Sequence, residues 1–366
     1  MAAEWITALA RYADRLHATA GDRHHVASPL GAWLLLALAG GENEALGVDA
    51  QQAARIAGAL LEEPHPLVAA ATALWHSEQV DPAALSGWRE NLPPATAFGP
   101  VPSKGELDAW AKEHTYGLID RFPLTPSPRM LVLLASALAT KVSWQVPFEE
   151  APASRLGGDW RQRLTTVLLS PEHGHQAFID EGRIVHVADA GGLKVYSVAA
   201  AAGVPAREVL AAAYEIAMNP MSRTSLFDLP LGETPLWTIR EERAHERRKE
   251  HVRALLPAWS ATSELNLAED PGLGFAEATR VIGERLGTPA PQFEAKQVAT
   301  ARYDRYGFEA AAVTGFMTTT SFPPEAPIRH AELRFAHPYA VVAVAAQPGG
   351  PWDGVPVFSG WVSDPQ

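Results

Sequence analysis

The sequence contains no cysteine among its 366 residues. This absence excludes a disulfide-stapled scaffold, thiol catalysis, and zinc or iron–sulfur sites held by cysteine. The sequence also has no long hydrophobic run, because its longest apolar stretches, residues 32–39 and 130–139, fall far short of the roughly 18–20 residues that span a bilayer. Residues 1–22 carry charges throughout an apolar helical pattern, unlike a secretory signal. We therefore expect a soluble, cytoplasmic protein.

Positive charge is also in deficit. Thirty Lys and Arg residues stand against 42 Asp and Glu residues, which gives a formal net charge of −12. This balance disfavours a non-specific nucleic-acid binder and a polybasic membrane binder, since both need excess positive charge. We expect neither a nucleic-acid partner nor a membrane partner.

Local catalytic and metal-binding motifs are absent as well. The sequence has no Gly-x-Ser-x-Gly elbow, no Walker loop and no His-Glu-x-x-His. His245 and His251 lie six residues apart, a poor spacing for a metal pair on one helix face, and the surrounding segment 240–253 mixes six Lys/Arg with four Glu. We interpret that segment as a solvated charged face, and His173-Gly174-His175 as an exposed turn. No metal, cofactor or catalytic set is expected from these motifs.

The composition is that of an ordinary globular protein, with 47% apolar and 20% charged residues, so the chain can bury a sizeable core. Residues 68–75 are either a buried strand or the end of a helix, and residues 130–144 read as a long buried strand. We expect one large α+β domain over residues 1–366, with helices dominating its first third. Helix patterns cover residues 5–18, 29–40 (capped by Ser28), 49–61, 107–118, 206–217 and 276–286, and strand patterns cover 164–200 and most of the last 70 residues.

The most informative segment is residues 303–327, which read YDRYGFEAAAVTGFMTTTSFPPEAP. It joins a glycine, a run of small residues and a tandem proline. As a strand, one face would carry Phe308, Ala310, Ala312 and Thr314, and the other Glu309, Ala311, Val313 and Gly315. The prolines would end the pairing, because each lacks a ladder donor. This pattern is typical of a loop that can become a strand.

At these residues the sequence resembles the serpin family, and especially its divergent members in actinobacteria. The likeness extends over nearly the whole chain, because further blocks occur in the family's order. These blocks are His25-Val26-Ala27-Ser28-Pro29-Leu30, Ala73-Leu74-Trp75, Leu107-Asp108-Ala109-Trp110 with Thr115 and Gly117, residues 131–148 ending in Trp144, Pro147 and Phe148, Phe335-Ala336-His337-Pro338-Tyr339, and Phe358-Ser359-Gly360-Trp361-Val362.

The resemblance implies the serpin fold, with about three β-sheets, eight or nine helices and an exposed reactive-centre-like loop. In inhibitory members a protease cuts this loop, which then inserts into the central sheet and traps the acyl-enzyme. The resemblance assigns the hinge and loop to Gly307, Phe308, Glu309, Ala310, Ala311, Ala312, Val313 and Thr314, with the cleaved bond at Ser321–Phe322 or Thr320–Ser321. It also assigns Ser28 and Gln297 to the sheet-opening region called the shutter, and Trp144 to the region called the breach.

Four residues depart from the family pattern. Phe308 stands at a hinge position where inhibitory members carry Thr or Ser, and Arg305 stands where the hinge usually has an acidic residue. Gln297 stands where a shutter histidine is expected, and Gly31 replaces a shutter serine.

Two functions therefore remain open. The first is a monomeric inhibitor of a subtilisin-, elastase- or chymotrypsin-like serine protease, which acts as a suicide substrate and needs no cofactor. The second is a non-inhibitory scaffold recruited to bind a small molecule, or even to act as an enzyme in a biosynthetic pathway.

Overall fold

Strands and helices are intermixed along the chain in the computed structural model, as expected for an α+β protein. The structure describes residues 2–140, 142–219, 223–245, 248–288, 293–307 and 325–366. Within these residues it contains seven α-helices, five short 3₁₀ helices and 17 strands. The strands form four hydrogen-bonded sets, which are two six-stranded sheets, one three-stranded sheet and one two-stranded sheet.

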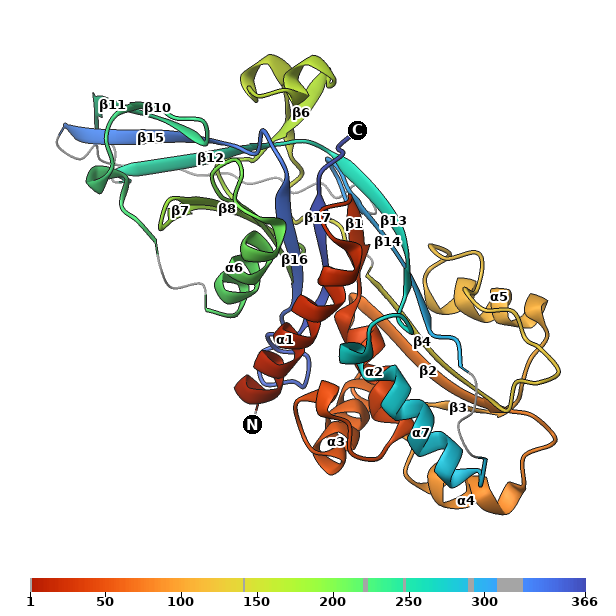
Figure 1. The fold of residues 1–366 in the computed structure, drawn as a ribbon. Coiled ribbons are helices and arrows are strands. Elements are labelled where there is room, and N and C mark those ends of the chain that lie inside the picture. The colour runs from red at the N-terminus through yellow and green to blue at the C-terminus, as the bar shows by residue number, and fades with distance from the viewer. Residues whose placement is uncertain (1, 141, 220–222, 246–247, 289–292, 308–324) are drawn as a thin grey trace.

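The first six-stranded sheet forms the middle of the molecule (Figure 1). All its neighbours pair antiparallel, and both β16 and β17 are buried along their whole length. Such two-sided burial explains why these strands are almost entirely apolar. Its strand order is β1 (His25–Ala27), β17 (Pro356–Val362), β16 (Tyr339–Ala345), β9 (Leu193–Ala199), β8 (Arg183–Asp189) and β7 (His175–Asp180).

The second six-stranded sheet lies at one end of the molecule, at the upper left of Figure 1. The segment 240–253, interpreted from sequence as a solvated charged face, contributes the end of one strand and the start of another here. Its strand order is β10 (Gly232–Glu233), β11 (Trp237–Ala244), β15 (Ala326–Arg334), β12 (Glu250–Leu256), β6 (Thr166–Leu169) and β5 (Glu149–Pro152).

The remaining strands form two separate ladders. One has the order β3 (Ala97–Pro100), β2 (Val68–His76) and β4 (Val132–Thr140), and the other pairs β13 (Trp259–Asn266) with β14 (Lys296–Tyr303). The open choice for residues 68–75 is thus settled as a strand, and the strand expected over 130–144 is shorter than predicted. In Figure 1 the long β13–β14 pair runs from the upper sheet down to the helices at the lower right.

The helices pack around these strands. α2 is buried at every residue except Leu35, because its sequence is apolar on all faces, and it contacts α1, α3, α7, β4 and β17. Ser28 caps it and Pro29 begins it, as predicted. The helix bounds are α1 (Ala2–Ala20), α2 (Pro29–Ala39), α3 (Ala50–Glu62), α4 (Pro82–Glu90), α5 (Lys104–His114), α6 (Ala206–Met218) and α7 (Phe275–Arg285). The 3₁₀ helices are η1 (Glu44–Leu46), η2 (Ala153–Arg155), η3 (Trp160–Gln162), η4 (Leu226–Asp228) and η5 (Pro271–Leu273).

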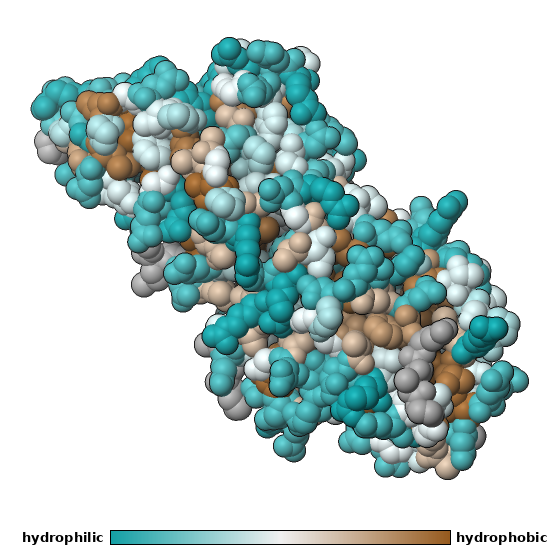
Figure 2. All heavy atoms as spheres, viewed as in Figure 1, coloured by the Kyte–Doolittle hydropathy of each residue, from teal (hydrophilic) through white to brown (hydrophobic). Residues whose placement is uncertain are grey.

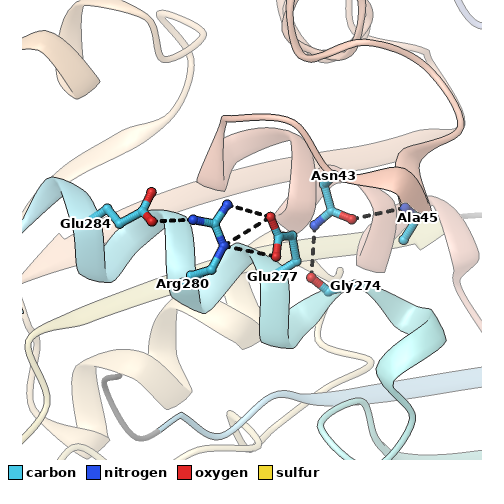
Figure 3. Close-up of polar contacts among 6 residues, drawn as sticks. All are labelled: Asn43, Ala45, Gly274, Glu277, Arg280 and Glu284. Carbon is cyan, nitrogen blue, oxygen red and sulfur yellow. Dashed lines mark hydrogen bonds and ion pairs between the residues drawn. The ribbon is translucent and has the colours of Figure 1, made fainter. Parts of the chain in front are cut away.

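Helix α7 is anchored at its N-terminus by Asn43, whose side chain is buried (Figure 3). Asn43 Nδ2 donates to the Gly274 carbonyl at 2.9 Å, and Asn43 Oδ1 accepts from the Ala45 amide at 3.0 Å. Farther along the exposed face, Arg280 pairs with Glu277 at 2.7 Å and also with Glu284. The buried amide thus ties α7 to η1, while the ion pairs stay on the surface.

Hydrophilic side chains cover most of the face drawn in Figure 2. Hydrophobic side chains reach the surface in the lower right part, where Figure 1 places α5, α7 and the strands between them. Among the described residues, no helix combines the length and apolar character needed to cross a membrane.

Replacement of Asn43 by alanine should lower the free energy of unfolding by about 1–3 kcal/mol, because it leaves the Ala45 amide unpaired inside the protein and removes one of the two hydrogen bonds that the Gly274 carbonyl accepts. Arg280→Ala, on the same helix, should lower it much less, since exposed ion pairs contribute little. Urea denaturation of the two variants measures the difference. Equal losses would contradict the anchoring role of Asn43.

Candidate functional site

A gap separates the edges of β4 and β14. Within the described residues, β4 pairs only with β2 and β14 only with β13, so each strand presents one unpaired edge to the other. Both edges line a cavity of about 960 Å³. Unpaired backbone groups at an edge are a template for a further strand.

Helices close the gap on two faces. Trp110 and Ala111 of α5 and Phe122 beyond it lie on one side, and Gly31 and Leu35 of α2 lie on the other. Successive side chains of β4 point to opposite faces of the sheet, so neighbouring residues of this strand contact different helices. Thus Ala135 packs in one cluster with α5, whereas Ser136 Oγ donates to the Gly31 carbonyl at 2.8 Å. Residues of α7, including Phe275 and Ile282, complete the wall.

The upper end of the gap is closed by the turn that follows β14. Gly307 forms an isolated antiparallel bridge with Ser143, and the Trp144 amide donates to the Tyr306 carbonyl at 3.2 Å. Asp304 Oδ1 accepts from the Gly307 amide at 2.9 Å, and the Asp304 carbonyl accepts from Trp144 Nε1 at 2.8 Å. Gly307 has φ 79°, and a Cβ there would overlap the Val142 carbonyl oxygen, so this position requires glycine.

A chain of polar side chains lies beneath this turn. The Val146 carbonyl accepts at 2.8 Å from His175 Nε2, and His175 Nδ1 lies 3.1 Å from His186 Nε2. Because a carbonyl can only accept, His175 Nδ1 must accept from His186, and His186 Nδ1 must accept from the Tyr303 hydroxyl at 3.4 Å. The last residue of β14 is thereby linked to the central sheet.

Burial keeps both imidazoles neutral. It lowers the pKa of His175 to about 4, against the opposing hydrogen bond to Val146, and it holds the pKa of His186 well below its ordinary value. Burial also raises the pKa of the Tyr303 hydroxyl. Trp144 covers the chain, with its ring 4.9 Å from that of Tyr303.

Gln297 joins β14 to the start of α2 at the cavity wall. Its Nε2 donates to the Ser28 carbonyl at 2.8 Å, and its Oε1 accepts from the Ser28 amide at 2.9 Å. Ser28 Oγ in turn accepts from the Gly31 amide and donates to the Val357 carbonyl at 2.9 Å. Gln297 therefore binds both backbone polar groups of one residue, as a neighbouring strand would.

The structure brings together part of the predicted site. Ser28 and Gln297 are in direct contact, and Trp144 and Gly307 meet at the upper end of the gap. The predicted loop residues Phe308, Glu309, Ala310, Ala311, Ala312, Val313, Thr314, Thr320, Ser321 and Phe322 lie outside the described residues.

Two histidines of the site were missed by the sequence interpretation. The expected exposed turn is correct for His173 but wrong for His175, which is half-buried and bonded to His186. The sequence did carry a usable signal, because the Glu181-Gly182 turn sets the β7–β8 register and places His186 diagonally across from His175. Among the described residues, no group of three or more His, Asp and Glu side chains could hold a metal ion.

Comparison with solved structures identifies the fold. Thyroxine-binding globulin in complex with thyroxine matches with a TM-score of 0.66 and 15% identity over 100% of both chains. The native state of the thermophilic serpin tengpin matches with a TM-score of 0.67 and 15% identity, over 98% of this chain and 94% of tengpin. Human glycosylated kallistatin matches with a TM-score of 0.63 and 17% identity, over 97% of this chain and 95% of kallistatin. The chain therefore has the serpin fold, as its motifs predicted. No family model and no curated protein matches the sequence.

The buried imidazoles make stability depend on pH. In the unfolded chain His175 takes up a proton below about pH 6.5, whereas in the folded protein its pKa is about 4. The free energy of unfolding should therefore fall as the pH drops from 6.5 towards 4, by on the order of 1 kcal/mol per pH unit for one such group. His175→Gln should remove part of this slope in denaturation series at pH 7.5, 6 and 5. His173→Gln, at the exposed neighbour, should keep it, and an unchanged slope in His175→Gln would refute the assignment.

Proposed function

We propose that this chain inhibits a serine protease by offering the loop after Gly307 as a substrate, and that the cut loop enters the gap between β4 and β14. The observation that carries the proposal is the pair of facing, unpaired strand edges, with the Ser143–Gly307 bridge already in antiparallel sense at their upper end. An entering strand would pair both edges and fill the cavity, so cutting the loop should stabilise the protein.

The bridge also supplies a register for the entering strand. If antiparallel pairing continues from Ser143 and Gly307, Ala312 falls opposite Leu138 and Ala311 opposite Ala139. Leu138 belongs to the main core on the α2 side, so Ala312 would point inward together with Phe308, Ala310 and Thr314. Ala311 would point to the other face, beyond the part of β4 that packs with α5. Small side chains on the inward face suit a confined slot.

The length of the loop fits the gap. In the same register Val132, the first residue of β4, falls opposite residue 318. Cleavage at Thr320–Ser321 or at Ser321–Phe322 would leave enough chain after Gly307 to reach that level. A small hydroxylated residue before the cut bond suits proteases with a small specificity pocket, which favours elastase- and subtilisin-like enzymes as partners. Phe308 is the one bulky inward residue, and overpacking of this kind costs about 1–3 kcal/mol.

The matched variants Ala312→Arg and Ala311→Arg test insertion. Incubation with subtilisin- and elastase-like proteases should give a covalent complex on denaturing gels for the unmodified protein and for Ala311→Arg. The cleaved forms of both should melt well above the intact protein. Ala312→Arg should be cut without forming a complex, because insertion would bury an unpaired guanidinium.

Two outcomes would contradict the proposal. The first is cleavage of the unmodified protein without a complex and without a rise in melting temperature. The second is equal behaviour of Ala311→Arg and Ala312→Arg, which would show that the loop does not enter the sheet in this register.

A second candidate function, a small-molecule carrier, is favoured by a groove of about 330 Å³ between α1 and α6. Four alanines, Leu210 and Met218 supply its apolar lining, and His17 and Tyr214 line its buried part. Charged side chains line it as well, namely Arg11, Asp14, Asp22, Arg207 and Glu215. Behind them, hydrogen bonds run from Tyr214 through Ser359 (2.7 Å) and His17 (2.6 Å) to His25 (2.7 Å), and then to the Arg23 carbonyl (2.8 Å). This size suits a small apolar ligand, and the matching thyroxine-binding globulin structure is itself a ligand complex.

The carrier function predicts saturable binding of the apolar fluorophore 8-anilinonaphthalene-1-sulfonate at one site. Ala211→Trp should abolish this binding, because the indole would fill the groove. Ala109→Trp, on the exposed face of α5 and away from the groove, should leave it unchanged. Binding that persists in Ala211→Trp would place the fluorophore elsewhere and remove the support for a carrier.

A further inference from the structure

The start of β15 lies between the ends of two strands that follow each other in the sequence. On one edge β11 pairs with it as far as Ala244↔Ala326, and on the other edge β12 pairs with it from Glu250↔Arg329. Figure 1 shows the three strands side by side at the upper left. Residues 240–245 and 248–250 therefore lie on both sides of the point where the chain enters β15.

The carboxylates of this segment are bound to neighbouring groups of the protein. Glu241 Oε2 accepts from Arg329 Nε at 2.8 Å, and Glu250 accepts from a backbone amide of η4 at 3.1 Å. Glu242 Oε1 lies 3.1 Å from His330 Nε2, and its side chain stays largely exposed. Two of these three carboxylates are thus used inside the fold.

The cations of the same segment are exposed instead. Arg243 comes no closer than 3.6 Å to its carboxylate partner, Glu325. Arg248 Nε donates only to a backbone carbonyl, that of Glu250. Within the described part of the chain, three of the four cations make no ion pair. We call the four cations the basic rim, which consists of Arg240, Arg243, Arg248 and Lys249.

The charge of the basic rim is opposite in sign to that of the whole chain, which has a formal net charge of −12. Even with Glu242 and Glu325 counted against them, the four cations leave an excess of positive charge at this end of the sheet. Exposed like charges repel one another and so disfavour the folded state. Such a surface is instead complementary to a partner that carries carboxylates.

The position of the basic rim indicates which partner meets it. Complexes of proteases with protein inhibitors bury about 800 Å² on each side, from roughly 20–30 residues. The protease cleft itself takes only the few residues around the cut bond, so the rest of the contact must come from surface beside the loop. Glu325 is the first residue that the structure describes after Gly307, and Arg243 lies next to it. The basic rim therefore falls within reach of a protease bound to the loop.

We infer that the basic rim is a second contact surface for the protease, and that it selects a protease with carboxylates around its cleft. This inference rests on the proposed function for the kind of partner. Attraction between the two surfaces raises the rate at which the protease meets the loop. The basic rim touches neither the gap nor the polar chain beneath the turn, so it acts on the choice of protease and not on insertion.

Subtilisin with two different surface charges tests the inference. Acylation of its lysines with succinic anhydride makes the enzyme acidic and leaves its catalytic serine unchanged. At low ionic strength the acylated enzyme should cut the loop of Arg240→Glu/Lys249→Glu about tenfold more slowly than the loop of the unmodified protein. Untreated subtilisin should distinguish the two proteins less. In 1 M NaCl, where charges more than about 3 Å apart are screened, the rates should converge.

The matched control is Arg55→Glu/Arg121→Glu, which changes the net charge equally. Arg55 lies on α3 and Arg121 between α5 and β4, both exposed and on elements that Figure 1 places away from the upper sheet. The acylated enzyme should cut this control as fast as it cuts the unmodified protein. Equal rates for the two double variants would overturn the inference, since net charge alone would then explain the effect.

The same reactions distinguish a failure of the inference from a failure of the proposed function. Cleavage of the unmodified protein without a covalent complex would refute inhibition, whereas the basic rim is judged by the ratio of cleavage rates alone. If the acylated enzyme cuts the loop of none of the three proteins, the inference is overturned together with the proposed function. Loss of retention on heparin–agarose in the rim variant alone, with unchanged cleavage rates, would assign the basic rim to a sulfated polysaccharide and overturn the inference.

Discussion

The edges of β4 and β14, which no described strand pairs, are the constraint on which the rest of the structure depends. Two strand edges inside a protein would normally pair, because unsatisfied backbone groups are unfavourable there. Here the residues around the two edges keep the edges apart. α2 and α5 occupy the two faces of the gap, α7 is anchored through Asn43, and Gln297 attaches β14 to both backbone groups of Ser28 instead of to β4. Among the described residues, the packing of its walls therefore maintains the gap.

Two buried histidine chains share one design. In each, a backbone carbonyl at one end can only accept, which sets the tautomer of both imidazoles and leaves a serine or tyrosine hydroxyl as donor at the other end. Each chain ties a different layer to the central sheet. The His17–His25 chain joins α1 and β1 to α6 and β17, and the His175–His186 chain joins the end of β14 to β7 and β8. Every imidazole nitrogen in the two chains already donates or accepts a hydrogen bond. Protonation of an imidazole would break the bond that it accepts, so both connections weaken in acid.

Local features of the fold were predictable from sequence, whereas contacts between distant segments were not. Ser28 as a cap, Pro29 as the first residue of α2 and the Glu181-Gly182 turn follow from residue chemistry within a few positions. The meeting of Ser28 with Gln297 followed only from the family resemblance, since nothing local links positions so far apart. The contact of Glu241 was hidden for the same reason. It lies in the segment 240–253 that was interpreted as a solvated charged face, and its partner Arg329 belongs to a strand 88 residues later.

The segments before and after the loop differ in how firmly they are held. Before the loop, β14 ends in a turn built on Asp304 and on a glycine whose backbone angle admits no side chain, so this end can extend the pairing with Ser143 by a change at very few bonds. After the loop, β15 is paired on both edges, and the side chains of Arg329 and Arg334 bind Glu241 and Glu233. Under the proposed function, the loop would therefore enter the gap from its Gly307 end while β15 stays in place.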